Sequence, residues 1–390
     1  MNVLYLNNYM LADAIERRGN ESTFSQAANN KIDQVKAAIE TNGHRVRMLS
    51  SGLTNNRSFR WHRGFRSELN QDLHYAGIFD LPLLNIITSI ASMCYRVFKL
   101  HRASKIDYLI FWNYKPEVAV VAYLCKLLLG IKIILDYEDG YFAMPGMKGK
   151  RKVINKIESF VKNKIDGAIL VSPDLVPRVE PKPFYVFRGL ANPAMLDHSL
   201  AAKRDKAKGD DIVLMYSGGL DHERGIDVLV EALKYTRESF SLVITGRGPL
   251  AKILNADADP RIRYLGYLDY ESAKRHMREA DILINTQRET IDFAFASFPS
   301  KIFDYLATDR LIVSSNVGNM RAFSEGAFYI YEKDDPKQLA AAIDKAIGEV
   351  ADGRSEHKLA LTRSLRDKLT PALVGKGLIA ALMKDSTNAT

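Results

Sequence analysis

Apolar-rich segments alternate with helical patterns along most of the chain. Helical spacing of apolar residues covers 27–41 and 117–129. Segments typical of buried strands occur at 3–6, 44–49, 108–112, 131–135, 168–171 and 184–187. Strands that alternate with helices predict a parallel α/β sheet, whose ligands bind at the carboxyl ends of the strands. Residues 7–24 are polar and irregular, and we expect no regular element there.

The alternation is interrupted once, by a charged and weakly patterned segment at 201–211. A chain of 390 residues also exceeds what one hydrophobic core usually supports. We therefore predict a first α/β domain at 1–200, a linker at 201–211 and a second α/β domain at 212–357. The segment 358–390 predicts two helices that are broken near Pro371.

A strand, a loop, a helix and another strand are predicted between residues 281 and 315. Pro299 and Ser300 are residue types that begin helices, and the apolar spacing that follows them is helical. The N-terminus of a helix offers unpaired N–H groups that suit a phosphate. Asp304 lies about one turn further in, where its carboxylate could accept hydrogen bonds from sugar hydroxyls. An ordinary buried helix with Asp304 at a hydrated edge explains the same pattern.

Three carboxylates follow the strand predicted at 131–135. Asp136, Glu138 and Asp139 lie at its carboxyl end, where one of them could bind sugar hydroxyls or act as a base. Alternatively, Asp139 and the following glycine only form a turn, and carboxylates also suit Mg²⁺. Asn113 and Tyr114 follow the strand at 108–112 and are further candidates at the same edge.

Several short motifs follow one another through the second half of the chain. They are Met215-Tyr-Ser-Gly-Gly-Leu-Asp-His-Glu-Arg-Gly-Ile226, Val243-Ile-Thr-Gly-Arg-Gly-Pro249, Ile262-Arg-Tyr-Leu-Gly-Tyr267, Ala296-Ser-Phe-Pro-Ser-Lys-Ile-Phe-Asp-Tyr-Leu-Ala307 and Val317-Gly318. In order and spacing they resemble a retaining GT-B-fold glycosyltransferase of family 4, the group 1 type. The resemblance implies two Rossmann-like domains whose parallel sheets face a central cleft, with a C-terminal helix that crosses back to the first domain.

The resemblance also implies roles for single residues. Asp304 matches an acid that holds the nucleotide ribose, and Arg224 matches a lysine that neutralises the donor diphosphate. Three positions depart from the family pattern: Ala296 replaces a first acid, Gly219 replaces an arginine, and Glu138 stands where a histidine often contacts the donor sugar. The sugar contact could therefore come from Glu138, or from Asp292 or Glu289 near Ala296.

From these arguments we predict a donor site in the second domain and an acceptor site in the first. Cations and backbone N–H groups stabilise the leaving diphosphate, and glycines let the backbone approach it. The predicted catalytic residues are Glu138, Arg224 and Lys301. The predicted donor-binding residues are Gly218, Gly219, Arg224, Arg247, Ser300, Lys301 and Asp304, and the acceptor-side candidates are Asn113, Tyr114, Asp136 and Asp139. Without the family match, Arg224 could equally be a solvated arginine at the start of a helix. We expect neither a metal nor a cofactor besides the nucleotide sugar.

Composition and charge limit the structural class of the protein and its possible binding partners. Hydrophobic residues make up 47% and charged residues 26% of the chain, as in ordinary globular proteins. The net charge of +9 lies entirely in residues 1–200. We find no signal peptide, and neither apolar stretch, 81–98 or 118–135, predicts a membrane span. The two cysteines, Cys94 and Cys125, are expected to be buried free thiols in a reducing cytoplasm.

Three features of the first half suit an anionic membrane surface. Residues 57–66 interleave arginines with aromatic residues, 83–100 form an apolar helical face with a basic end, and 148–164 contain seven basic residues and one acid. A solvated basic face beside a core helix is the alternative.

We therefore expect a glycosyltransferase that moves a sugar from a nucleotide-diphospho sugar to a lipid-linked or oligosaccharide acceptor in bacterial surface polysaccharide synthesis. It would work in the cytoplasm, peripherally on the inner face of the cytoplasmic membrane, and would bind no nucleic acid. A nucleotide-sugar 2-epimerase and a non-catalytic nucleotide-sugar-binding protein are the alternatives.

Overall fold

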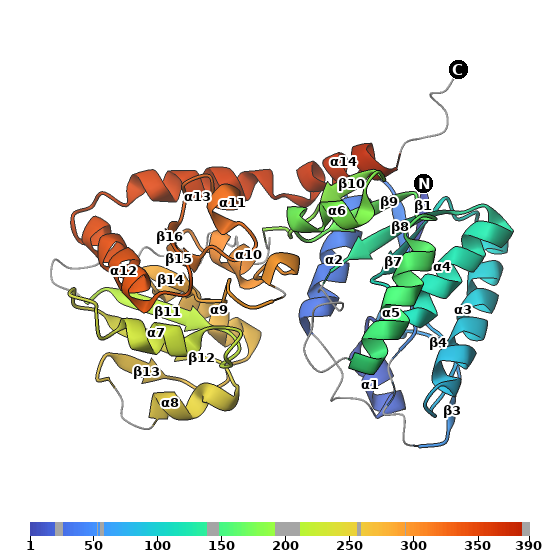
Figure 1. Cartoon of the computed structure of the whole chain (residues 1–390), viewed down its shortest axis with the longest axis horizontal. Coiled ribbons are helices and arrows are strands. Elements are labelled where there is room, and N and C mark those ends of the chain that lie inside the picture. The colour runs from blue at the N-terminus through green and yellow to red at the C-terminus, as the bar shows by residue number, and fades with distance from the viewer. Residues whose placement is uncertain are drawn as a thin grey trace. The chain divides into compact units, whose positions relative to one another are not determined.

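The computed structural model describes residues 1–19, 26–52, 54, 58–138, 148–191, 211–255, 259–292 and 294–383 (Figure 1). The chain forms two compact units. The first contains Met1–Gly189 and Pro371–Thr390, and the second contains Leu190–Thr370. The predicted linker at 201–211 lies outside the described residues apart from Asp211.

The first unit is built on an eight-stranded sheet. Its order is β10-β9-β8-β7-β1-β2-β5-β4, and all neighbouring strands are parallel except β4 and β5. The central β1 has four apolar residues in succession, all buried, because the sheet is covered on both faces. The strands are β1 (Asn2–Asn7), β2 (Arg45–Ser50), β4 (Phe65–Arg66), β5 (Leu73–Tyr75), β7 (Tyr108–Trp112), β8 (Lys132–Tyr137), β9 (Gly167–Leu170) and β10 (Phe184–Val186).

Helices α3, α4 and α5 lie beside one another in this unit (Figure 1). The described helices of the unit are α1 (Ala12–Arg18), α2 (Gln26–Glu40), α3 (Leu84–Ala103), α4 (Pro116–Leu129), α5 (Lys148–Val161), α6 (Val176–Val179) and α14 (Pro371–Leu382), with a 3₁₀ turn at Pro173–Leu175. None of the helices in the described part of the chain is long and apolar enough to cross a membrane, as predicted for 81–98 and 118–135.

Helix α1 contradicts the expectation of an irregular segment at 7–24. Tertiary hydrogen bonds hold it, because the buried Arg18 guanidinium donates to the carbonyl oxygens of Ser51 at 3.1 Å and Ala76 at 2.6 Å. A buried arginine reads as polar in a hydropathy pattern, so apolar periodicity gave no signal for this helix.

A small antiparallel sheet, β3 (Trp61–His62) with β6 (Ile78–Phe79), is fastened to α3 by side-chain hydroxyls. Ser92 accepts a hydrogen bond from the Gly77 N–H at 2.7 Å, and Thr88 accepts one from the Phe79 N–H at 3.0 Å. The hydroxyls lie one turn apart on one flank of α3, so they serve two backbone donors at and just before β6.

The second unit contains a six-stranded parallel sheet of order β13-β12-β11-β14-β15-β16. The chain runs from β11 outward to β13 and then returns to place β14 on the other side of β11. The loops after β11 and β14 therefore diverge, which is where open α/β sheets bind ligands. The strands are β11 (Val213–Ser217), β12 (Ser241–Thr245), β13 (Ile262–Tyr264), β14 (Ile282–Asn285), β15 (Leu311–Ser315) and β16 (Tyr329–Tyr331).

Two hydrophobic cores flank this sheet. Leu214 and Tyr216 point into one core and Met215 into the other, so alternate residues of β11 are buried on opposite faces. The helices are α7 (Ile226–Ala232), α8 (Lys252–Asn255), α9 (Tyr270–Glu279), α10 (Lys301–Leu306), α11 (Met320–Ser324), α12 (Pro336–Ala351) and α13 (Glu356–Lys368), with 3₁₀ turns at Pro249–Ala251 and Ala294–Ala296.

The two predicted C-terminal helices, α13 and α14, belong to different units. Helix α14 packs on α2 within the first unit, whereas α13 contacts α10 and β15 within the second. The boundary predicted at residue 358 is thus one helix too early, and the change of unit falls at Pro371. Both helices have apolar faces, so the pattern alone did not tell which core each one covers.

Close backbone contact fixes α14 against α2, and it predicts a stability difference between two helical glycines. A Cβ on Gly375 would lie 1.9 Å from the carbonyl oxygen of Ala38, whereas one on Gly348 in α12 meets nothing within 4 Å. We expect Gly375→Ala to destabilise the first unit by about 1–3 kcal/mol, and Gly348→Ala to stabilise the second by about 0.5–1 kcal/mol. Thermal melts of both variants test this, and equal melting temperatures would contradict the α14 packing.

Candidate functional site

The loop after β11 approaches two other segments so closely that only glycine fits. A Cβ on Gly218 would lie 2.7 Å from the Lys301 ammonium, and one on Gly246 would lie 1.8 Å from the Gly218 carbonyl oxygen. The Gly218 N–H donates to the Thr245 carbonyl at 3.1 Å, which ties this loop to the loop after β12. Gly218 therefore lets the backbone pass close to a buried cation.

The Lys301 ammonium is buried against the face of the Tyr216 ring. Its Nζ lies 4.1 Å from the ring centroid, and no acceptor among the described residues forms a hydrogen bond with it. Burial, and then the nearby Arg224 guanidinium, lower the pKa of Lys301 to about 7. A buried cation without an acceptor is costly, and such a group in a native structure calls for an anionic partner.

Arg224 lies beside Lys301, and its guanidinium is held by a neutral side chain. Its Nη1 donates to Gln287 Oε1 at 2.7 Å, and its carbonyl oxygen accepts from Thr286 Oγ1 at 2.8 Å. Its N–H donates to Asp221 Oδ1 at 2.8 Å. The solvated arginine considered as the alternative does not describe this side chain, which is half-buried and fixed in place. Neither cation is part of an ion pair among the described residues.

The helix that carries Lys301 offers fewer free N–H groups than predicted. Helix α10 has 6 residues, and Ser300 stands exposed at its start without a side-chain capping hydrogen bond. The N–H groups of Ile302 and Phe303 donate to the carbonyl oxygens of Pro299 and Ser300, both at 3.1 Å. We had predicted that these N–H groups bind a phosphate, but tight turns already use them. The Lys301 ammonium is therefore the main positive group at the N-terminus of α10.

Asp304 and Arg247 lie at the edges of this group, each next to a tyrosine. Asp304 accepts a hydrogen bond from the Tyr270 hydroxyl at 3.1 Å, and the pKa of Tyr270 is raised by burial and by that carboxylate. The Arg247 guanidinium lies 4.9 Å from the centroid of the Tyr267 ring. Both pairs offer a flat aromatic surface beside a charged group, which suits a nucleoside.

Ala296 cannot be replaced by an acid without burying a charge. Its side chain is fully buried in the 3₁₀ turn Ala294–Ala296. Of the two acids suggested as substitutes, Asp292 is exposed, and Glu289 accepts a hydrogen bond from the Lys333 N–H. Burial raises the pKa of Glu289. The Glu289 carboxylate thus already has a backbone partner, and a contact between Glu289 and a sugar stays a prediction.

In the first unit, two predicted acids share one lysine. Glu138 Oε1 lies 2.5 Å from Lys31 Nζ, and Asp136 Oδ1 lies 3.9 Å from the same atom. Glu138 also accepts from Trp112 Nε1 at 3.1 Å, and Asp136 accepts from the Tyr5 hydroxyl. Burial and these two acids raise the pKa of Tyr5 well above its ordinary value. Lys31 comes from α2, far away in the sequence, and sequence analysis missed it.

The remaining acceptor-side candidates differ in their surroundings. Asn113 adopts a φ of +55° and its Oδ1 accepts from the Glu138 N–H at 2.8 Å, so it positions the acidic segment. The Tyr114 ring is buried between aromatic neighbours, which makes it a core residue. Asp139 lies outside the described residues.

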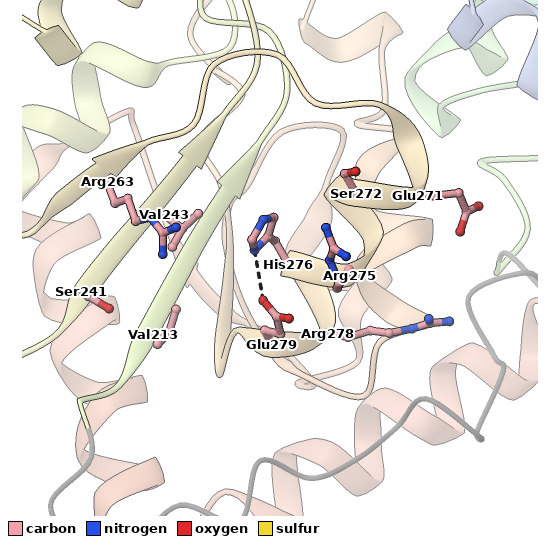
Figure 2. Close-up of a pocket in the computed structure, with 10 residues that line it drawn as sticks. All are labelled: Val213, Ser241, Val243, Arg263, Glu271, Ser272, Arg275, His276, Arg278 and Glu279. Carbon is pink, nitrogen blue, oxygen red and sulfur yellow. Dashed lines mark hydrogen bonds and ion pairs between the residues drawn. The ribbon is translucent and has the colours of Figure 1, made fainter.

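A separate hollow of about 930 Å³ lies along α9, on the face of β11, β12 and β13 (Figure 2). Both arginine and glutamate side chains line it, and His276 Nδ1 lies 3.0 Å from Glu279 Oε2. It contains none of the predicted site residues. Among the described residues, no group of three or more His, Cys, Asp or Glu side chains is arranged to hold a metal ion.

Three further residues of the donor group were missed by sequence analysis: Tyr216, Asp221 and Gln287. Tyr216 and Gln287 lie at or just after the ends of β11 and β14. Their position at the carboxyl ends of central strands is the signal that could have found them.

The depressed pKa of Lys301 predicts a stability gain when its charge is removed. The folded pKa of about 7 lies below the value of an unfolded lysine, so the cost of burying the charge is full below pH 7 and fades as the pH rises toward 10. We expect Lys301→Met to raise the free energy of unfolding at pH 6 by about 1–4 kcal/mol, and by much less at pH 9.5. Denaturant titrations at both pH values check this, and a pH-independent effect would contradict it.

Comparisons with known proteins agree with this architecture. Residues 211–349 match the family model described as "Glycosyl transferases group 1". A search of curated proteins gave no match. Three similar solved structures are a sucrose-phosphate synthase from Thermosynechococcus elongatus (TM-score 0.69, 15% identity, 97% of each chain covered), Anabaena Alr3699/HepE in complex with UDP (0.66, 12%, 98% of this chain and 99% of that one), and the lipopolysaccharide outer core galactosyltransferase WaaB (0.65, 14%, 98% and 99%).

At these identities the likeness to the solved structures concerns the fold, and it extends over nearly the whole chain. The family match covers the region that contains Gly218, Arg224, Lys301 and Asp304. Residues 211–349 therefore match the glycosyl transferases group 1 family, and the chain has the GT-B fold of the similar glycosyltransferase structures.

Proposed function

We propose that the protein transfers a sugar from a nucleoside-diphospho sugar to an acceptor hydroxyl. The observation that carries this proposal is the pair of cations at the carboxyl ends of β11 and β14. Lys301 is buried without an acceptor, and Arg224 beside it is held by the neutral Gln287. Burial, and then repulsion from Arg224, lower the pKa of Lys301, and a diphosphate between the two cations would compensate both charges.

The same pair suits the chemistry of sugar transfer. The bond between the anomeric carbon and the diphosphate oxygen breaks, and negative charge grows on that oxygen while the acceptor oxygen bonds to the anomeric carbon. The acceptor proton leaves to a phosphate oxygen or to a carboxylate. Lys301 and Arg224 would stabilise the growing charge, and their positions are fixed before the reaction. Transfer with retention of configuration is part of this proposal.

The nucleoside would lie along the edge formed by Asp304 and Arg247. Asp304 would accept hydrogen bonds from the ribose, and the rings of Tyr270 and Tyr267 would flank the base or the ribose. Ser300 and the backbone at Gly219 would complete the donor contacts. The complex of the similar HepE with UDP makes uridine nucleotides the first donors to test.

For the acceptor we propose a lipid-linked glycan of bacterial surface polysaccharide synthesis, used at the inner face of the cytoplasmic membrane. The excess of positive charge in residues 1–200 supports this, and so does the likeness to WaaB, a lipopolysaccharide galactosyltransferase. We propose that no metal is needed, since Lys301 and Arg224 supply the positive charge that a cation would bring.

A non-catalytic donor-binding protein is the second candidate. It is favoured by the buried Ala296, by Gly219 in place of an arginine, and by the full engagement of Glu138 with Lys31 and Trp112. Donor binding with no turnover of any acceptor would support it. Conversion of a labelled UDP-sugar without any acceptor would point instead to a 2-epimerase.

The donor site predicts separate effects of its charged residues. We expect Lys301→Met and Asp304→Ala to weaken UDP binding on the order of tenfold to a hundredfold, through lost charge-assisted hydrogen bonds. Arg224→Ala should lower turnover on the order of a hundredfold or more, because its charge acts most in the transition state. Calorimetry above pH 7 should also show proton uptake on UDP binding, since the anion recharges Lys301.

The exposed Lys252 provides the matched control, and Lys252→Met should leave binding, turnover and proton uptake unchanged. If all three site variants kept wild-type binding and turnover with every active donor, the assignment of this donor site would be wrong. Proton uptake that persists in Lys301→Met would assign the titrating group elsewhere.

The acidic group of the first unit yields a second functional prediction. We expect Glu138→Gln to remove most of the transfer activity. Ala296→Glu should not raise the activity above that of the wild type, and it should destabilise the protein because the new carboxylate would be buried. Turnover and melting temperature are measured for both variants. Lys31→Met is the companion variant: if Glu138 serves only to satisfy Lys31, the double variant will recover the activity lost by Glu138→Gln.

A further inference from the structure

The outward side of α3 is apolar over most of its length. Leu84, Ile87, Tyr95 and Phe98 are 42%, 61%, 67% and 49% exposed, and they recur at intervals of three or eight residues. They therefore form one stripe on the helix, and the exposed Ala91 fills the gap in it. The stripe lies on the side opposite to Met93 and Val97, which are buried in the core.

The stripe continues beyond the start of α3. Leu83 is 75% exposed, and Phe59 and Trp61 are 71% and 50% exposed. These residues lie together because Trp61 pairs with Phe79 across β3 and β6, and the Asp80 N–H donates to the Arg60 carbonyl at 2.9 Å. Phe59 and Leu83 both have a positive φ, of +50° and +68°. Bulky residues rarely adopt this conformation, so two strained positions hold apolar side chains outward.

The charges around the stripe have one sign. Residues 58–66 contain three arginines and no acid, and residues 81–106 contain four basic residues and no acid. Arg60, Arg63 and Arg66 are exposed on the segment that runs beside α3, where Gly64 lies close to Arg96, and Lys99 and Arg102 are exposed at the end of the stripe. Cations thus flank an apolar stripe on a helix of 20 residues, about 30 Å long.

The fold itself does not need this side of α3. One flank of α3 is already fastened to the β3–β6 pair through Thr88 and Ser92, and the helix packs against α4 (Figure 1). Large apolar side chains that stay exposed on a well-anchored helix indicate a surface that binds another protein or a membrane.

We propose that α3 and the segment 58–66 dock the first unit on an anionic lipid bilayer. The apolar stripe would enter the boundary between headgroups and acyl chains, Phe59 and Trp61 would lie at headgroup depth, and the flanking cations would contact anionic headgroups. A bilayer fits better than a protein because the surface is long and apolar and has no acid that could pair with basic groups of a partner. The inference rests on the proposed function, since it gives the lipid-linked acceptor a place where the enzyme meets it.

The test is co-sedimentation of the full chain with vesicles of phosphatidylcholine, with and without phosphatidylglycerol. We expect binding to the anionic vesicles only. Ile87→Asp should lower it on the order of tenfold at every salt concentration, and the triple change of Arg60, Arg63 and Arg66 to Glu should lower it on the order of a hundredfold at low salt and less at high salt.

Matched controls come from outside the surface. Leu373→Asp changes a residue that is 57% exposed on α14, and the triple change of the exposed Arg237, Lys252 and Lys345 to Glu removes the same charge from the second unit. Neither control should lose vesicle binding. Each variant is also melted and titrated with UDP, so a folding defect is recognised.

Three results would overturn the proposal: equal binding to neutral vesicles, equal loss in variants and controls, or a dimer in sedimentation velocity that Ile87→Asp converts to monomer. The last would assign the surface to a second copy of the chain. Vesicle binding needs no donor, so its failure leaves the proposed transfer reaction standing. Intact vesicle binding without any nucleotide binding would instead remove the proposed function.

Discussion

The packing of the Lys301 ammonium against the ring of Tyr216 is the interaction on which the loops of the second unit depend. A side chain at position 218 would collide with the ammonium, and the guanidinium of Arg224 is near enough to lower its pKa. The ring offsets part of the cost of burying the charge, because its face is electronegative. It provides no hydrogen bond, however, so the cation stays available to an anion. The site is thus less stable than a fully paired one, as expected where function requires a group kept ready to bind.

In the first unit, in contrast, the buried charged groups have partners within the protein. Lys31 contacts both Asp136 and Glu138, and Tyr5 and Trp112 each donate to one of the two carboxylates. Internal donors therefore compensate the acids before any ligand arrives. Such a cluster holds its carboxylates in one geometry, and removing one partner would leave another uncompensated. The two units thus differ in kind: the second presents the buried Lys301 ammonium without an acceptor, and the first presents acids whose positions are fixed.

Sequence patterns predicted what depends on burial, and they missed what depends on contacts between distant residues. The central strands were found because residues such as Val3 and Leu283 are buried on both sheet faces, which makes the runs continuously apolar. Helix α1, the β3–β6 pair and the contact of Lys31 with Glu138 were missed because long-range hydrogen bonds create them. Arg224 could be nominated from the family pattern, and Lys301 from its position at the start of a predicted helix. Their neutral or aromatic partners, Gln287 and Tyr216, follow only from the three-dimensional arrangement of β11 and β14.

The glycine at position 219 shows how a departure from the family pattern fits the rest of the site. A Cβ at this position would lie 2.9 Å from Asp221 Oδ2 and 3.3 Å from Arg224 Cγ. Asp221 in turn accepts a hydrogen bond from the Arg224 N–H, just before Gly225 begins α7 with a φ of +66°. An arginine at 219 would thus disturb the turn that places Arg224 next to Lys301. An arginine here would have to displace the side chains of Asp221 and Arg224, whereas glycine leaves both in place. Glycine at 219 therefore fits this loop conformation, and Arg224 and Lys301 are the cations on which the proposed diphosphate contact depends.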